Sequence, residues 1–300
     1  MSQPRRVLPG ATHLVTRRCA DRRFYLRPDH DVGLIFVFCL ALAALVSGVQ
    51  VHAWCVMSNH VHVVVTDTRG ELPIFLHRLG RNVAMAVKVL RGIRENVWST
   101  DAPSVVELVT PEAVLDAMLY VLVQAVDAGI VHHPDEWIGS HPAMRFFDGR
   151  PRAYKRPRVW FRAKSPLATE VELRVTMPEA LRAIGFMPER FEKDMTRLVD
   201  GRAKDLVVAA RAEGRRCSGI ASALAVSAFD SPATFEPARG RNPSLKASAP
   251  TALREAIACL RSFRARYRAA LLSLRKREPA LFPLGTWLLR RIAGVTVAPT

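Results

Sequence analysis

The stretch WCVMSNHVHVVVTD, residues 54–67, contains two histidines separated by one residue. Its run of valines predicts a β-strand, and residues i and i+2 of a strand point to the same face. His60 and His62 would therefore lie side by side, while the intervening valines pack on the other face. Two adjacent imidazoles are half of a binding site for a divalent metal. Taken alone, however, the pair fits two structural histidines better than a metal site.

A second group of polar residues lies in the apolar segment TPEAVLDAMLYVLVQAVDAG, residues 110–129. Its Thr-Pro-Glu start and its terminal glycine predict one helix. Asp116, Tyr120, Gln124 and Asp127 have the spacing of one helical face. A tyrosine one turn from an amide oxygen can supply a nucleophile and complete a metal site. Without the histidines, the same pattern fits a half-buried core tyrosine and a solvated glutamine.

Strands and helices alternate around these residues. Hydrophobic alternation predicts strands at 12–19, 49–57, 61–67 and 104–109, with a tight turn at 58–60, and helical spacing predicts helices at 31–47, 72–91 and 110–129. The resulting order β-α-β-β-α-β-α predicts an α+β fold, with a ferredoxin-like (split βαβ) antiparallel sheet and packed helices. A mainly helical, basic C-terminal region follows it.

One apolar segment, residues 32–51, has about the length of a membrane span. Gly48 interrupts it, the next residues alternate like a strand, and it has neither aromatic anchors nor a second span beside it. We therefore expect a buried helix from Asp31 to about Ser47, and no membrane partner.

The charge is unevenly distributed over the 300 residues. Residues 1–150 carry 15 Lys and Arg against 14 Asp and Glu, whereas residues 151–300 carry 29 against 13. Such an excess indicates a polyanionic partner, first nucleic acid and then an anionic membrane, or else an arginine-rich protein without such a partner. The split predicts two domains, 1–145 and 146–300. The proline-punctuated basic stretch at 150–166 is expected to be a linker or an arm that contacts nucleic acid.

Five scattered cysteines form no C-x-x-C pair. This pattern argues against a disulfide scaffold or a zinc ribbon and favours a reducing compartment. The first residues, MSQPRRVLPG, have no apolar stretch of the kind found in signal peptides. We therefore expect a cytoplasmic protein, associated with the nucleoid if its partner is DNA.

The motif MSNHVHVVV resembles the histidine–hydrophobic–histidine marker of the IS200/IS605-like single-tyrosine (Y1) HUH transposases, especially those associated with repetitive extragenic palindromes (REP). The early stretch HLVTRRCADRRF resembles their first strand and loop, and YVLVQAVDAGIV resembles their tyrosine helix. The resemblance covers about residues 10–145, in the same order and spacing. It implies a catalytic domain at 1–145.

The resemblance assigns roles by position. His60 and His62 would be metal ligands, Gln124 the third ligand and Tyr120 the nucleophile, with Mg²⁺ or Mn²⁺ as cofactor. The activity implied is cleavage and rejoining of single-stranded or hairpin DNA through a 5′-phosphotyrosine intermediate, by a homodimer whose tyrosine acts in cis or in trans. Gln124-Ala125 departs from the Asn-Pro that palindrome-linked members usually have, and no catalytic motif occurs beyond residue 150.

Candidate DNA-contacting arginines lie in two basic stretches, one beside the first predicted strand and one in the basic arm. They are Arg17, Arg18, Arg22, Arg23, Arg156 and Arg158.

Two other interpretations compete with a transposase. A domesticated relative could bind hairpins or repeats in DNA without cleaving them. Because Tyr120, His60 and His62 are all present, an enzyme is favoured over that silent binder. A basic membrane-surface protein built on residues 32–51 leaves the histidines and the polar helix face unexplained, and we rank it last.

Overall fold

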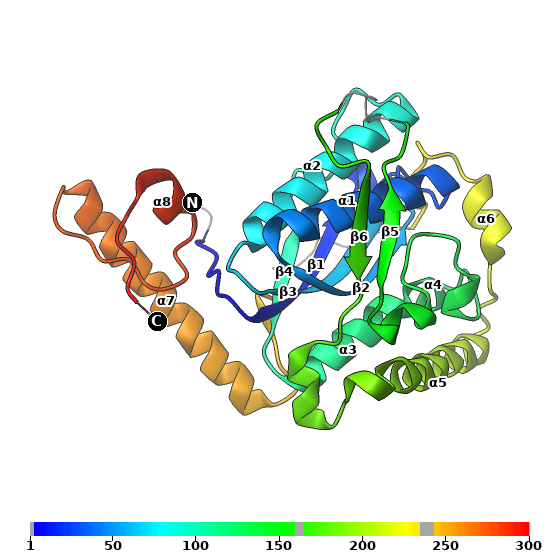
Figure 1. Cartoon of the computed structure of the whole chain (residues 1–300). Coiled ribbons are helices and arrows are strands. Elements are labelled where there is room, and N and C mark those ends of the chain that lie inside the picture. The colour runs from blue at the N-terminus through cyan, green and yellow to red at the C-terminus, as the bar shows by residue number, and fades with distance from the viewer. Residues whose placement is uncertain (1–2, 160–164, 235–242, 300) are drawn as a thin grey trace.

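The computed structural model describes residues 3–159, 165–234 and 243–299. Within these residues a five-stranded sheet has helices on both faces (Figure 1), so the α+β class is confirmed. The sheet order is β2-β3-β1-β4-β7, antiparallel except for the last pair. The strands are β1 (Ala11–Arg18), β2 (Gln50–Met57), β3 (His60–Asp67), β4 (Ser104–Leu108) and β7 (Leu245–Lys246).

Strand β3 lies between β1 and β2 and is paired along its whole length. Cys55 of β2 and Thr16 of β1 are the register partners of His62. The predicted strand ends agree with the observed ones to within one residue. The tight turn expected at 58–60 is formed by Ser58 and Asn59, and β3 begins at His60.

The two faces of the sheet are covered by different helices. Helices α1 (His30–Ser47) and α2 (Leu72–Arg91) pack together over one face, and α3 (Pro111–Leu122) covers the other (Figure 1). Val61 and Val63 point toward the side of α1 and α2, where they line one cavity with Phe36 and residues of α2. By strand alternation, the two histidines of β3 therefore face α3.

Helix α1 is the apolar segment that resembled a membrane span. It is long and apolar enough to cross a membrane by length and composition alone. Asp29 caps its N-terminus by accepting a hydrogen bond from the Val32 amide, and Gly48 ends it at a φ of +73°. Residues on most of its circumference are buried in the protein core, as the sequence predicted for a buried helix.

The chain after residue 145 continues to cover this core. The basic stretch at 150–166 was expected to be a linker or an arm, but its first residues form β5 (Pro151–Lys155), which pairs with β6 (Glu170–Arg174) in a hairpin packed on α1. Alternate apolar residues of the hairpin are buried, which explains why it does not extend as a linker. Residues 160–164 of that stretch lie outside the described residues.

Beyond the hairpin, the chain passes the edge of β2 and reaches the other face. The Thr176 amide donates to the Val51 carbonyl, and α5 (Phe191–Ala212) packs beside α3. Phe191 and Met195 of α5 belong to the same core cluster as Trp54 of the sheet. The division into domains 1–145 and 146–300 stays a prediction, although the hydrophobic core extends across residue 145.

The C-terminal helices extend away from the sheet. Helix α7 (Pro250–Arg275) follows β7, and α8 (Leu288–Ala293) lies beside it near the N-terminal segment (Figure 1). Leu245 of β7 forms a small hydrophobic cluster, separate from the main core, with Leu260 and Phe263 of α7. The remaining short helices are η1 (Ala20–Arg22), α4 (Gln124–Asp127), η2 (Pro134–Glu136), η3 (Met144–Asp148), η4 (Glu179–Ile184), η5 (Pro188–Arg190) and α6 (Gly219–Ala225).

One predicted helix is divided. The continuous helix expected at 110–129 begins as predicted, with the Thr110 hydroxyl accepting from the Ala113 amide. It breaks at Val123, whose φ of −96° and ψ of 10° are not helical. The amides of Val126 and Asp127 both donate to the Val123 carbonyl, which tightens the chain into the short helix α4.

A buried histidine in β2 makes the stability of the fold depend on pH. The His52 ring is enclosed between the Thr176 carbonyl, 2.7 Å from Nδ1, and the Thr66 hydroxyl, 2.8 Å from Nε2. Burial lowers the pKa of His52 from 6.5 to about 4, and the bond to Thr176 acts in the other direction. The unfolded chain therefore binds a proton that the folded chain excludes. This contribution to stability is complete above pH 6.5 and is lost as the pH falls toward 4.

We predict that His52→Gln flattens the pH dependence of the free energy of unfolding between pH 6.5 and 4. The slope should fall by up to ~1.4 kcal/mol per pH unit, the value for one proton. Urea denaturation at several pH values measures it, and His132→Gln, at an exposed histidine, serves as the control. Parallel slopes for His52→Gln and the parent protein would contradict the assignment.

Candidate active site

His60 and His62 lie on the same face of β3, beneath α3. Their ring centroids are 4.9 Å apart, and the rings meet edge to face at 83°. The i, i+2 spacing on a strand accounts for this arrangement, because both side chains leave the backbone on the same side. The two imidazoles predicted from the sequence are thus side by side.

The turn between β2 and β3 fixes the tautomer of His60. The Asn59 amide nitrogen Nδ2 donates to the Arg22 carbonyl, at 3.2 Å, so Oδ1 is the atom that faces His60. Nδ1 of His60 lies 2.7 Å from Asn59 Oδ1 and must carry the hydrogen of this bond. The lone pair of His60 Nε2 is therefore available to bind a metal.

His62 is held by the neighbouring strand. Its Nδ1 lies 2.8 Å from the Thr16 hydroxyl, on the register partner in β1. Burial lowers the pKa of His62 well below 6.5, and the neighbouring His60 and Arg18 act in the same direction. Burial likewise lowers the pKa of His60 to about 4, with Arg18 adding to this effect and Gln124 opposing it. Both imidazoles are therefore neutral near pH 7.

Tyr120 and Gln124 complete the cluster from α3 and α4. The Tyr120 ring lies against His62, with centroids 5.2 Å apart and an angle of 77°. Nε2 of Gln124 donates to the Tyr120 carbonyl at 3.1 Å, and the same side chain interacts with the His60 ring and the Tyr120 hydroxyl. The break at Val123 places Gln124 at the start of α4, where its side chain is buried.

The structure thus brings together the four residues that the sequence proposed. The roles predicted for them stay predictions. Tyr120 is 44% exposed and is therefore accessible to a substrate, whereas His62 and Gln124 beside it are buried and His60 is half-buried. Burial raises the pKa of the Tyr120 hydroxyl, whereas the contact with Gln124 and the charge of Arg18 lower it.

A metal would find two kinds of donor here. No group of three or more His, Cys, Asp or Glu side chains that could hold a metal occurs in residues 3–159, 165–234 and 243–299. The donor set is instead two neutral imidazoles and one amide oxygen. Because Nε2 of Gln124 is bonded to the Tyr120 carbonyl, its Oε1 is the atom left for a metal. These residues fit a divalent ion that accepts both nitrogen and oxygen ligands.

Tyr120 lies at the junction of two open grooves. The larger, about 650 Å³, runs past His62 to the start of β4, and the smaller, about 360 Å³, lies between α3 and α5. Arg17 and Arg18 line the larger groove, and Arg17 donates to the Ser99 and Asp101 carbonyls. Their contact with DNA stays a prediction. Two basic residues of the C-terminal half line these grooves. Lys246 lines both of them, and Arg202 lines the smaller one. Neither was predicted from the sequence, because only the net charge of that half pointed to them.

The other candidate arginines are placed differently. Arg22 donates to the Thr234 carbonyl at 2.6 Å, and Arg23 to the Phe229 carbonyl, so they hold a distant segment against η1. Arg156 donates to the carbonyls of residues 165 and 167 within its own hairpin. Arg158 is exposed in the same hairpin, which packs on α1, the layer opposite α3. The structure does not bring these four arginines to Tyr120.

Comparison with known proteins finds partial matches. No family model and no curated protein matches the chain. A solved structure of a REP-associated tyrosine transposase bound to a REP hairpin is similar at 17% identity and a TM-score of 0.39, over 46% of this chain and 80% of that one. A candidate transposase from Deinococcus radiodurans R1 is similar at 17% identity and a TM-score of 0.28, over 35% of this chain and 85% of that one.

Both solved structures are of transposases, the class of protein that the motif MSNHVHVVV resembles. Likeness at these TM-scores decides nothing about the chemistry. Any function assigned to the chain has to rest on the side chains around Tyr120.

We predict that Thr16→Val lowers the free energy of unfolding by ~1–3 kcal/mol, because the buried Nδ1 of His62 loses its hydrogen-bond partner. Urea denaturation at pH 7 measures the change. Thr16→Ser keeps the hydroxyl and should stay within about 1 kcal/mol of the parent, the cost of one methyl group. Equal losses in the two variants would show that the hydroxyl of Thr16 does not support His62.

Proposed function

We propose that the chain is a single-tyrosine transposase that cleaves and rejoins single-stranded or hairpin DNA through a 5′-phosphotyrosine intermediate, with Mg²⁺ or Mn²⁺ as cofactor. One observation carries this proposal. An accessible tyrosine lies against His62, which lies beside His60, and one turn from a buried glutamine amide, at the junction of two grooves lined by basic side chains.

The architecture supports the proposal. The elements β1-α1-β2-β3-α2-β4, with β1 paired between β3 and β4, follow the order of a ferredoxin-like split βαβ sheet. We infer that the chain has this fold, in which the central strand carries the histidines and a helix laid across the sheet carries the tyrosine.

Basic side chains in the larger groove would bind the phosphates of the DNA strand. Arg17, Arg18 and Lys246 line the larger groove, where their charges attract the phosphates of a strand without reading its bases. Because Tyr120 borders both grooves, a strand bound along them passes its hydroxyl.

The chemical step starts at Tyr120. Its hydroxyl oxygen attacks the phosphorus and releases its proton to solvent, while the bond from phosphorus to the 3′ oxygen breaks. The leaving 3′ oxygen takes up a proton and becomes a 3′-hydroxyl, so a phosphotyrosine replaces one phosphodiester bond. A 3′-hydroxyl of the same or another strand reverses the step, and no external energy source is required.

The neighbours of Tyr120 favour this step. Gln124 and Arg18 oppose the effect of burial on the Tyr120 pKa, and they therefore stabilise the phenolate that attacks. Asn59 and Thr16 each bond Nδ1 of one imidazole, so a metal would bind through Nε2 of both rings. A divalent ion bound by His60, His62 and Gln124 would neutralise charge on the scissile phosphate.

A second copy of the chain is not needed to complete this site, because Tyr120 and both histidines of one chain already lie together. We keep the homodimer, the cytoplasmic location and the association with the nucleoid as proposals that come from the sequence.

We predict a covalent adduct between Tyr120 and DNA. The probe is a pool of single-stranded DNA hairpins with randomised flanks, incubated with Mn²⁺ or Mg²⁺ and separated under denaturing conditions. A fluorophore at the 3′ end should stay with the protein, because the tyrosine bonds to the 5′ phosphate of the downstream fragment. A fluorophore at the 5′ end should be released.

Tyr120→Phe removes only the hydroxyl, so it should abolish the adduct and leave hairpin binding within about twofold. His60→Ala and His62→Ala should abolish it too, as should chelation of the metal. Tyr154→Phe, in the hairpin on the opposite layer, is the matched control and should react like the parent. An adduct that persists in Tyr120→Phe would overturn the assignment, and hairpin binding without any adduct would identify a silent binder.

We predict that Mn²⁺ binds the protein in the absence of DNA and that Asn59 supports this binding. Asn59→Ala frees the His60 ring to turn and should weaken Mn²⁺ affinity by about 10- to 100-fold, the usual effect of losing the partner of a ligating histidine. Asn59→Asp keeps an oxygen acceptor and should bind Mn²⁺ at least as well as the parent. Calorimetric titration measures both, and equal affinity in the alanine variant would exclude this role.

A further inference from the structure

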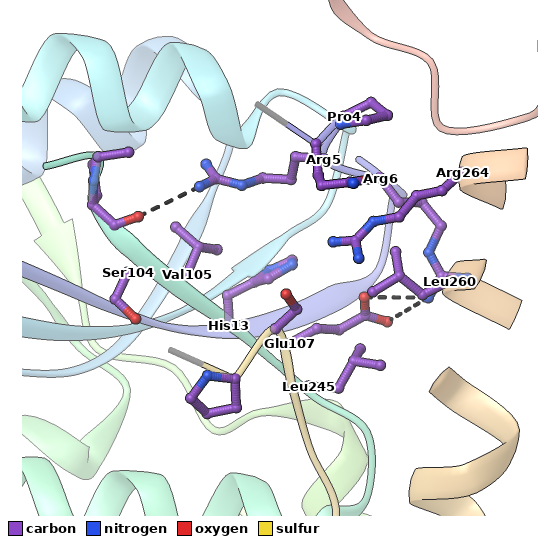
Figure 2. Close-up of a pocket in the computed structure, with 15 residues that line it drawn as sticks. Pro4, Arg5, Arg6, His13, Ser104, Val105, Glu107, Leu245, Leu260 and Arg264 are labelled. Atoms are coloured by element: carbon purple, nitrogen blue, oxygen red, sulfur yellow. Dashed lines mark hydrogen bonds and ion pairs between the residues drawn. The ribbon is translucent and has the colours of Figure 1, made fainter. Parts of the chain in front are cut away.

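Another cavity, about 270 Å³, is lined by residues of β1 and β4 that alternate with those facing the tyrosine groove, so it lies on the opposite face of these strands. Figure 2 shows the side chains that line it. His13 of β1 and Glu107 of β4 are register partners and form its floor. Arg5 and Arg6 come from the N-terminal segment, and Arg264 comes from α7. The cavity is therefore built by three parts of the chain that are far apart in the sequence.

The polar groups of this cavity are incompletely paired. His13 is only 4% exposed, and its Nδ1 has no hydrogen-bond partner among the residues that the structure describes. The Nε atoms of Arg6 and Arg264 are also buried without a partner in those residues. Figure 2 shows the His13 ring and the Arg264 guanidinium pointing into the same space. A buried donor without a partner is unfavourable, and a bound group that accepts hydrogen bonds would remove that cost.

The charges indicate which kind of group would bind. Glu107 is paired with Arg6, whose Nη2 lies 3.0 and 3.2 Å from its two carboxylate oxygens. Neither Arg5 nor Arg264 forms an ion pair within the described residues, and Arg5 reaches only the Pro103 carbonyl, at 3.4 Å. The cavity thus has an excess of guanidinium groups, whose geometry matches the oxygens of a phosphate.

His13 fits the same ligand. Burial lowers the pKa of His13 to about 4, Arg5 and Arg6 lower it as well, and the Ala11 carbonyl acts in the other direction. The ring is therefore neutral near pH 7, and in one tautomer it offers an N–H donor to an anion without adding charge. A phosphate that binds here would bring negative charge next to the neutral ring and shift its signal in a magnetic resonance spectrum.

The cavity is held in shape by main-chain bonds and adjoins the tyrosine groove. The Val7 amide donates to the Gly285 carbonyl at 3.1 Å, and the Glu107 amide to the Ser244 carbonyl at 3.0 Å, so both flanking segments are fixed. The cavity and the larger groove share residues 102–104 and Pro243. A strand that leaves the groove over this loop reaches the cavity.

We propose that this cavity binds a phosphate of the DNA strand, next to the phosphates that lie in the Tyr120 groove. The inference rests on the proposed function for the source of the phosphate, while the anion site itself depends only on His13 and the arginines. In this proposal α7 contributes to DNA binding through Arg264, which contacts a phosphate outside the Tyr120 groove.

The anion site is tested with inorganic phosphate on the full chain. The histidine ring signals are recorded during the titration, and the His13 signal is assigned from its loss in His13→Gln. We expect phosphate to shift this signal, and Arg264→Gln to weaken the apparent affinity by roughly tenfold, the effect of one charged hydrogen bond. Arg266→Gln, exposed and about 200° around α7, is the matched control and should bind like the parent.

The DNA part is tested in the Tyr120→Phe background, in which the strand stays intact. Single-stranded DNA alone should shift the His13 signal, and added phosphate should then cause no further shift. Arg264→Gln should weaken DNA binding roughly tenfold at fixed salt, whereas Arg266→Gln should change it by less than twofold. A His13 signal that moves with inorganic phosphate but not with DNA would overturn the DNA source and assign the cavity to free phosphate. If the His13 signal does not move and Arg264→Gln matches Arg266→Gln, the arginines serve only to pack α7, and the inference is wrong.

These outcomes are independent of the covalent adduct. An adduct formed at Tyr120 without any effect at His13 would reject this inference and keep the transposase. A phosphate shift at His13 in a protein that never forms an adduct would keep the anion site and reject the transposase.

Discussion

The hydrogen-bonded pairing of β3 on both sides is the constraint on which the site depends. With β1 on one edge and β2 on the other, the strand has no freedom to slip, because a shift of one residue would move every side chain to the other face. The valines on one face already commit it to the side of α1 and α2. His60 and His62 are therefore forced under α3, where Asn59 and Thr16 each bond one ring nitrogen.

The site combines rigid ligands with an accessible nucleophile. The two imidazoles are set on a central strand, the most constrained element of a sheet, whereas Tyr120 is carried by a helix whose outer side remains open to the grooves. The break at Val123 separates the residue proposed as nucleophile from the residue proposed as metal ligand. It lets Tyr120 stay on α3 at the surface while Gln124 turns inward and bonds to the carbonyl at the end of that helix.

Local patterns in the sequence predicted most of this arrangement. Three features depend only on residues close together in the sequence, and each was predicted correctly. They are the cap at Thr110, the alternation of β3, and the i, i+4 spacing of Tyr120 and Gln124. The break at Val123 was not predicted, because an apolar residue within a helical pattern gives no sign of it. The hairpin at 151–174 was missed as well, since its strands gain their stability from packing on α1, a contact that neighbouring residues do not reveal.

The folded structure also shows that the net charge of each half does not determine where the basic surface lies. Arginines of the first half, among them Arg22, Arg23 and Arg91, donate to main-chain carbonyls and hold segments together. Much of the positive charge counted there is therefore structural. Basic residues of the second half are placed next to the first half in the folded chain. Lys246 and Arg202 line the tyrosine grooves, and Arg264 lines the cavity beside α7. A half with almost no net charge can thus present a basic surface to a polyanion, because the fold and not the sequence decides which guanidinium groups face the substrate.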